Sequence, residues 1–320
     1  MITNTYDTLG ISKTPELIFG LVGPIGVDME MVQKKLETAL LSVGYNPTSF
    51  RVTDLMRQIE TDIDIKEDKN PLTHYENRID YANAVRKKCQ NDAALAALSM
   101  LAIKTYRASH HDQNESQDNS DDRPIDNQAY IIRQFKRKEE ISLFRAVYGK
   151  KFIQISVHMN AKDREENLIY RISQRNHSLK TDELEDVART LIKRDYDESA
   201  AVHGQRVAEA FHLGDVFVSA KSEKEAEQTI QRFIKAFFGK NSLSPSKDEY
   251  GAYIAASASY RSIDTSRQIG AAIFTTEGEI IAMGSNEVPA YGGGTYWIDH
   301  PDPHRDFCLL YTSPSPRDRG

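Results

Sequence analysis

Cysteine is scarce in this chain, because only Cys89 and Cys308 among its 320 residues carry a thiol. Two cysteines cannot build the disulfide framework of a small secreted domain, and so few are typical of a reducing compartment. The sequence has no run of about eighteen apolar residues, the length that a membrane-spanning helix needs. Residues 1–16 lack a cationic segment followed by an apolar one, which a secretory signal would show. These absences predict a soluble, cytoplasmic protein with no membrane partner.

An excess of positive charge is also lacking. The 41 Lys and Arg residues are outnumbered by 47 Asp and Glu residues, and the formal net charge is -6. Non-specific nucleic-acid binding depends on bulk positive charge, so nucleic acid is not an expected partner. The basic stretch at 133–138 is either a local phosphate-binding patch or a solvated helix start. The length allows two domains, each with its own core.

The first apolar stretch leads directly into a loop with two glycines. Leu17–Val22 is continuously apolar, which predicts a strand buried on both faces of a parallel sheet. Leu36, Leu40 and Val43 then keep a helical spacing down to Gly44, which predicts a helix that ends there. Strand, glycine loop and helix in this order are the context of a P-loop. The candidate nucleotide-binding residues are Gly20, Gly23, Pro24, Ile25, Gly26 and Asp28.

The loop departs from the phosphate-binding pattern G-x-x-x-x-G-K-[ST]. Counted from Gly23, the last glycine, the lysine and the hydroxyl residue are replaced by Asp28, Met29 and Glu30. The lysine normally supplies positive charge to the β- and γ-phosphates, and the hydroxyl binds magnesium. Phosphoryl transfer is therefore not expected, and Glu30 is expected to place an anion where phosphate would bind. The helix N-terminus still favours an anion, so nucleotide binding stays open beside a retained fold element without chemistry.

Strands and helices alternate through residues 48–218. β-Prone apolar runs at 48–52, 128–133, 152–157 and 216–218 predict strands, and helical spacings lie between them. This alternation predicts an α/β fold with a doubly wound parallel sheet and right-handed crossovers. Residues 109–122 are almost devoid of apolar side chains and predict a mobile loop, so His110-His111 is solvated rather than metal-binding. Arg194-Asp195 is either a phosphate or switch element or an ordinary helix-end ion pair.

A helix and a hairpin are predicted after a polar linker at 242–246. The helix is expected at 247–260, and the apolar runs 269–275 and 279–284 with a Glu277-Gly278 turn predict the hairpin. This order, with RQ at 267–268 before the hairpin and GSNEVP at 284–289 after it, resembles the opening of the zinc-dependent cytidine and deoxycytidylate deaminase fold.

The first part of the chain resembles the P-loop kinase-like domain that is fused to deaminases in antiphage dCTP deaminases. The similar segments are GLVGPIG at 20–26, RIDYANAVRKKCQNDAALAALSMLAI at 78–103, AYIIRQFKRKEEISLFRAVYG at 129–149, and LIKRDYD through GQRVAEAFHLGDVFV at 191–218. With the hairpin region, the resemblance covers most of residues 16–307. It implies dCTP or dCMP as substrate, hydrolytic deamination at cytosine C4 with release of ammonia, a catalytic zinc and a homo-oligomer.

The resemblance also implies substrate-binding residues. The asparagine after the second strand usually meets the sugar in that family, a role that falls to Asn286 unless it only caps a turn. Arg261, Ser262, Arg267 and Glu287 are the other candidates; a guanidinium forks onto phosphate oxygens, yet each arginine is equally suited to a structural ion pair. The family's zinc site uses His-x-Glu and Pro-Cys-x-x-Cys. Neither motif is expected anywhere in this chain, so no catalytic or metal-binding residue is assigned.

The last thirty or so residues contain three weaker patterns. Gly292–Gly294 before Tyr296-Trp297 suits either a close backbone approach to a nucleotide or a flexible rim loop. His300 and His304 lie among three aspartates, but the two prolines beside them favour an unanchored loop over a metal site. Residues 308–320 resemble the translation of a sequencing adapter, which predicts a non-native tail. The rival interpretation is a natural Ser/Pro-rich tail.

Five segments are therefore expected. They are a flexible N-terminus (1–14), a degenerate P-loop nucleotide-kinase-like domain (15–241), a linker (242–246), the N-terminal part of a deaminase domain (247–307) and the tail (308–320). The first hypothesis is a fragment of a deoxycytidine-nucleotide deaminase that is itself inactive. The alternatives are a non-catalytic nucleotide-binding regulatory module and, less favoured, a nucleotide kinase. A hairpin without further strands should expose an edge and apolar surface.

Overall fold

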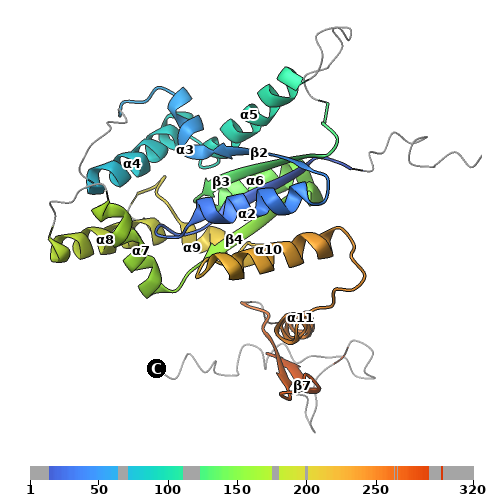
Figure 1. Ribbon diagram of the computed structural model, residues 1–320. Helices are drawn as coiled ribbons and strands as arrows, with labels where there is room; N and C mark the ends of the chain where they lie inside the picture. Colours follow the sequence, from blue (N-terminus) through green and yellow to red (C-terminus); the bar gives the residue numbers. More distant parts are fainter. Residues whose placement is uncertain are drawn as a thin grey trace, which may run out of the picture. The chain divides into compact units, whose positions relative to one another are not determined.

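The computed structural model describes residues 14–63, 71–110, 123–174, 180–198, 201–262, 264, 266–287 and 297 (Figure 1). The chain forms two compact units, residues 1–240 and 241–320. Nearly all of the expected flexible N-terminus, most of the 109–122 loop and the whole 308–320 tail lie outside the described residues. None of the helices in the described part combines the length and apolar character needed to span a bilayer.

A five-stranded parallel sheet forms the centre of the first unit. Its strands are β1 (Leu17–Val22), β2 (Asn46–Arg51), β3 (Gln128–Phe135), β4 (Phe152–His158) and β5 (Val216–Ser219), in the order β2-β3-β1-β4-β5. Each neighbouring pair runs parallel. Every residue of β1 is buried, as expected for a strand covered on both faces. The predicted doubly wound α/β fold is confirmed.

Helices cover both faces of this sheet (Figure 1). They are α2 (Met29–Leu41), α3 (Val52–Leu55), α4 (Pro71–Cys89), α5 (Ala94–His110), α6 (Lys138–Tyr148), α7 (Ala161–Ser173), α8 (Thr181–Tyr196), α9 (Val207–Phe211) and α10 (Glu223–Phe237), with short 3-10 turns at Met56–Gln58 and Gly149–Lys151. Phe19 and Ile131 pack with α2 and α10 on one face. Ile18 and Ile132 pack with α4, α5 and α6 on the other. Successive residues of these strands therefore contribute their side chains to opposite cores.

A bulge near the end of β3 decides where its last side chains point. Leu21 and Val22 of β1 pair with Arg133 and Phe135, so Gln134 is the extra residue. The φ of Gln134 is 82°, in the left-handed region that side chains rarely adopt. An extra residue reverses the alternation of a strand. Phe135 therefore returns to the hydrophobic core of Ile132, and Arg133 stays on the opposite face.

We expect Gln134→Val to lower the free energy of unfolding by about 1–3 kcal/mol, because a β-branched residue strongly disfavours a left-handed backbone. Gln134→Gly is the matched control, since glycine adopts this conformation without a Cβ penalty. Urea unfolding followed by far-UV circular dichroism measures both variants. If the two variants are equally stable, the left-handed bulge at Gln134 is contradicted.

The second unit contains a helix packed on a hairpin. These elements are α11 (Lys247–Ser259) and the antiparallel strands β6 (Gly270–Phe274) and β7 (Ile280–Ser285). The N-cap Ser246 forms a capping box with Glu249, which explains where α11 begins. A Cβ on Gly270 would lie 1.9 Å from the Ala255 carbonyl oxygen, so the first strand needs glycine to approach the helix. The predicted helix and hairpin are confirmed.

Much of the hairpin's apolar surface is exposed. Ile273, Ile281 and Met283 are 59%, 63% and 56% exposed. Alternate residues of β6, Gly270, Ala272 and Phe274, are the partly buried ones, and the phenylalanine ring contacts Tyr250 of α11. Helix α11 therefore covers only one face of β6.

Candidate functional site

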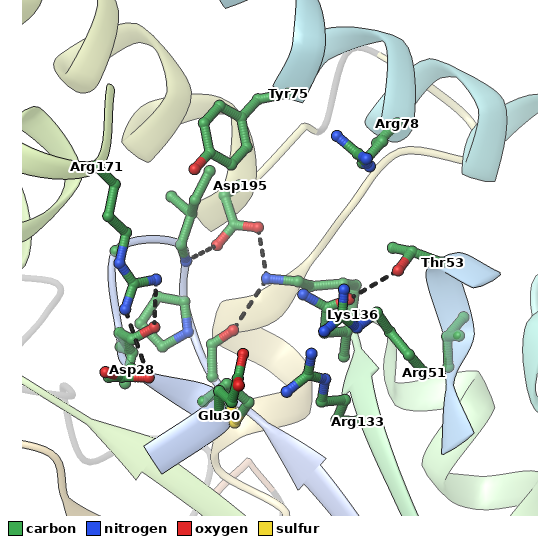
Figure 2. Close-up of a pocket in the computed structure, with 18 of the residues that line it drawn as sticks. Asp28, Glu30, Arg51, Thr53, Tyr75, Arg78, Arg133, Lys136, Arg171 and Asp195 are labelled. Atoms are coloured by element: carbon green, nitrogen blue, oxygen red, sulfur yellow. Dashed lines mark hydrogen bonds and ion pairs between the residues drawn. The ribbon is translucent and has the colours of Figure 1, made fainter. Parts of the chain in front are cut away.

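A pocket of about 1040 Å³ opens in the first unit, where the carboxyl ends of β1 and β3 meet (Figure 2). Its walls come from the glycine loop at 23–28, α2, α3, α4, the end of β3, α7 and α8. Ligands of open α/β sheets bind at this edge of the sheet. The volume is slightly above the usual range for ligand pockets, about 300–1,000 Å³. The pocket is therefore the candidate binding site of the unit.

The glycine loop leaves little room for side chains at two positions. A Cβ on Gly23 would lie 2.5 Å from the end of the Met29 side chain and 3.1 Å from the Val157 carbonyl oxygen, a tight contact. Gly26 has a φ of 93°, and a Cβ there would lie 2.6 Å from the Arg164 carbonyl oxygen. Gly26 is thus required by close approach of the main chain and by its left-handed backbone, whereas a side chain at Gly23 would need Met29 to move.

Other predicted loop residues also have structural roles. Asp28 caps α2 by accepting a hydrogen bond from the Met31 amide at 3.1 Å. Pro24, Ile25 and Asp28 line the pocket. Gly20 instead lies inside β1, where a Cβ would meet the Phe152 ring at 2.7 Å. Close packing in the sheet, rather than a place in the pocket lining, explains that glycine.

A carboxylate of the chain itself binds the glycine loop. Asp195 Oδ2 accepts a hydrogen bond from the Ile25 amide at 2.6 Å, and Oδ1 accepts one from Lys136 Nζ at 2.7 Å. Lys136 also donates to the Gly23 carbonyl oxygen at 2.9 Å. Asp195 is only 2% exposed. An amide at this point of a P-loop would face a phosphate, so here the negative charge is internal (Figure 2).

The arrangement changes two expectations about the loop. The anion against the loop is Asp195, whereas Glu30 pairs with Lys34 on its own helix at 3.1 Å. The ammonium group that Met29 cannot supply comes from Lys136, directly after β3. Lys136 belongs to the basic stretch 133–138. That stretch was the only feature of the sequence that pointed to a cation for the glycine loop.

Arg194 and Asp195 serve different places and do not form the helix-end pair considered from the sequence. Arg194 Nε donates to Glu198 at 2.7 Å, and its guanidinium also binds Asp80. Burial alone would lower the pKa of Arg194, but these hydrogen bonds raise it overall. Arg194 therefore ties α8 to α4, while Asp195 points to the loop.

Every acidic side chain that the structure describes in the pocket lining already has a cationic partner. The pairs are Asp28 with Arg171 at 3.5 Å, Glu30 with Lys34 at 3.1 Å, Asp54 with Arg51 at 3.8 Å, Asp195 with Lys136 at 2.7 Å and Glu223 with Lys35 at 2.7 Å. The hydrogen bond from Lys35 lowers the pKa of Glu223 and raises that of Lys35, so both stay charged at neutral pH. The acidic lining is therefore neutralised by its own partners.

Two further guanidinium groups enter the pocket, from Arg133 and Arg78 (Figure 2). Arg133 is 7% exposed, and no residue in the described part of the chain hydrogen-bonds or ion-pairs with its side chain. Arg78 contacts His74 one turn earlier on α4. Among the described residues, the pocket thus presents the positive charge of Arg133 without a side-chain partner that neutralises it. A phosphate or carboxylate is the chemical complement of such a site.

The predicted substrate residues of the second unit gather around Asn286. Its side-chain amide donates to the Arg267 carbonyl oxygen at 2.7 Å and accepts from the Ile269 amide at 2.7 Å. Ser262 Oγ donates to the Asn286 carbonyl oxygen at 2.8 Å. These bonds tie the end of β7 to the segment before β6, which is a structural role. A contact between Asn286 and a sugar stays a prediction.

The remaining candidates of this unit are dispersed. The Arg261 guanidinium lies 3.9 Å from the centroid of the Trp297 ring, a cation–π contact. The Arg267 side chain is exposed and Glu287 is half-buried. Gly292–Gly294, His300 and His304 lie outside the described residues.

The expectation that the chain contains no His-x-Glu is wrong, because His74 and Glu76 have that spacing. Both residues belong to α4 of the first unit, where Glu76 lies 4.0 Å from Arg194 and His74 contacts Arg78. Among the described residues, no group of three or more His, Cys, Asp or Glu side chains is placed to hold a metal ion. The described residues therefore do not fit the catalytic zinc of the deaminase fold.

Comparisons of the chain with protein-family models and with curated proteins found no match. Among solved structures, it is similar to an uncharacterized protein from Eubacterium ventriosum ATCC 27560, with 13% identity, a TM-score of 0.35, and coverage of 69% of this chain and 98% of that chain. Shikimate kinase from Bacteroides thetaiotaomicron is similar with 9% identity and a TM-score of 0.35, and the match covers 69% of this chain and 98% of that chain. A gluconokinase from Sinorhizobium meliloti 1021 is similar with 12% identity and a TM-score of 0.32, and the match covers 71% of this chain and 98% of that chain.

Similarity at this level carries no argument about function. The assignment of the fold rests on the parallel sheet itself and on its opening, in which β1, the glycine loop and α2 follow one another. By these features the first unit is an α/β domain of the P-loop kinase-like type.

Proposed function

We propose that the first unit binds a phosphorylated nucleotide in the pocket beside the glycine loop and does not transfer its phosphoryl group. The observation that carries this proposal is the positive charge of Arg133, which has no side-chain partner among the described residues, in a pocket whose described acidic side chains are all paired with other cations. Phosphoryl transfer requires a lysine and a hydroxyl group at the positions of Met29 and Glu30. Lys136 offers an ammonium group, but it is already bound to Asp195.

For the whole chain, the proposed ligand class is the deoxycytidine nucleotides, dCTP or dCMP. Support comes from the segments that resemble antiphage dCTP deaminases and from the helix and hairpin of the second unit. Deamination in that family proceeds through zinc, and this sequence contains no Pro-Cys-x-x-Cys. The proposal for this chain is therefore binding without deamination, within a homo-oligomer as the resemblance implies. A regulatory nucleotide-binding module is the second candidate and makes the same binding prediction.

We expect dCTP and dCMP to bind at least about tenfold more tightly than deoxycytidine, since charge-assisted hydrogen bonds to phosphate contribute about 1.5–3 kcal/mol. Isothermal titration calorimetry on the purified chain measures the three affinities, with ATP as a fourth ligand. Assays for released ammonia and for ADP should both remain negative. Equal affinity for dCTP and deoxycytidine would overturn the phosphate-dependent site, and ADP production would favour the kinase alternative.

A further inference from the structure

We propose that Arg133, and not the amides of the glycine loop, is the phosphate anchor of this pocket. The inference rests on the proposed nucleotide binding and specifies which group receives the phosphate. It reverses the usual P-loop arrangement, in which the loop itself encloses the phosphates.

The loop is a poor phosphate site because its own carboxylate already fills it. The Ile25 amide donates to Asp195 at 2.6 Å, and the ammonium group nearest the loop, Lys136, is bound to the other oxygen of the same carboxylate. A phosphate that entered here would have to displace a carboxylate that is 2% exposed. It would also meet a negative charge already in place, which disfavours a second anion.

Arg133 is in the opposite situation. Arg133 as a residue is 7% exposed, its guanidinium points into the pocket, and its side chain has no hydrogen-bonding or ion-pairing partner among the residues that the structure describes (Figure 2). Burying a charge without a partner is costly, so a bound anion would offset a cost that the unliganded protein carries. The planar fork of arginine suits two phosphate oxygens at once.

The backbone around Arg133 holds it in this place. In the sheet it pairs with Leu21 of β1 and with Arg51 of β2. The next residue, Gln134, adopts the left-handed φ of 82° that forms the bulge. Such strained conformations occur most often at functional sites, where the surrounding structure maintains them. The bulge separates Arg133 from the hydrophobic core that receives Phe135.

The rest of the pocket suits the other end of a nucleotide. Apolar lining residues come from α3, the 3-10 turn, α4 and α5, namely Val52, Met56, Ile79, Ala82 and Leu95. Arg78 enters from α4 beside them. A ligand with a terminal phosphate on Arg133 and a flat, weakly polar ring against this wall matches both surfaces. This is the chemistry of a nucleotide, whereas inorganic phosphate would use Arg133 alone.

The test compares wild type, Arg133→Gln, Arg133→Lys and the control Arg171→Gln. Arg171 also lines the pocket but pairs with Asp28. Titrations with dCTP, inorganic phosphate and deoxycytidine should show that Arg133→Gln weakens dCTP binding by about tenfold or more and leaves deoxycytidine unchanged. Arg133→Lys should lose less dCTP affinity than Arg133→Gln does. Arg171→Gln should weaken dCTP binding by less than about threefold. The melting temperature of unliganded Arg133→Gln should equal or exceed that of wild type, because the change removes a buried charge without a partner.

Each outcome decides between the two proposals. If wild type binds dCTP and Arg133→Gln binds it equally well, this inference fails while nucleotide binding stands. If wild type binds none of the nucleotides, the proposed function fails and the anchor fails with it. If inorganic phosphate binds as tightly as dCTP, Arg133 is an anion site without the nucleotide wall, and the ligand class is overturned.

Discussion

Glu140→Ala is expected to lower the free energy of unfolding by about 3–5 kcal/mol, the range for breaking a buried ion pair by removing one partner. Arg86 Nη2 donates to Glu140 Oε1 at 2.8 Å, and each side chain is 1% exposed. Glu140 Oε2 accepts from the amides of Lys136 and Arg137 at 2.8 and 3.1 Å. Without the carboxylate, a guanidinium remains buried and uncompensated, and the start of α6 loses its cap.

Urea unfolding followed by far-UV circular dichroism measures this loss. The control is Glu139→Ala, because the neighbouring carboxylate is 32% exposed and also binds an arginine, Arg137. Arg137 is itself 2% exposed, but it keeps Asp92 at 2.7 Å as a second carboxylate partner, so the expected loss is only about 1 kcal/mol. Comparable losses in the two variants would show that the Arg86–Glu140 pair is not the anchor between α4 and α6. Nucleotide affinity should fall with Glu140→Ala as well, since Glu140 holds the main chain at Lys136.

Asp195→Ala should make the stability of the chain strongly dependent on phosphate. The change leaves Lys136, whose side chain is 14% exposed, with only the Gly23 carbonyl oxygen, and it opens the Ile25 amide. In buffer without phosphate we expect a loss of about 3–5 kcal/mol. A ligand that binds only the folded state returns stability by mass action, about 2.7 kcal/mol at one hundred times its Kd. Added phosphate or nucleotide should therefore restore much of the loss.

The measurement is the melting temperature against phosphate concentration, in wild type and in two variants. Asp54→Ala is the control, because Asp54 lines the same pocket but is 64% exposed and 3.8 Å from Arg51. Its phosphate response should match that of wild type. If phosphate raises the melting temperature of Asp195→Ala by no more than it raises that of the control, the carboxylate does not occupy an anion site.

The fold was predictable where local patterns carry it. The buried run of β1 and the Glu277-Gly278 turn between two apolar runs each specify one element within a few residues. Helix α11 ends at Ser259, within one residue of the expected boundary. Hydrophobic burial and turn chemistry act over short stretches, so one sequence suffices to locate such elements.

The site was less predictable because its partners are far apart in the chain. Ile25 and Asp195 are 170 residues apart, and Gly23 and Lys136 are 113 apart. No spacing rule connects such residues; only the order of the strands brings them together. The isolation of Arg133 depends on the bulge at Gln134, which no proline or glycine marks in the sequence. The local pattern therefore located the loop but not the groups that fill it.

A crystal structure of the chain with bound dCTP tests the central claim most directly. The account predicts phosphate oxygens about 2.7–2.9 Å from the Arg133 guanidinium nitrogens, the usual length of such charged hydrogen bonds. The Ile25 amide should still donate to Asp195 in that complex. A phosphate on the Ile25 amide with Asp195 displaced, or a nucleotide bound only to the second unit, would contradict it.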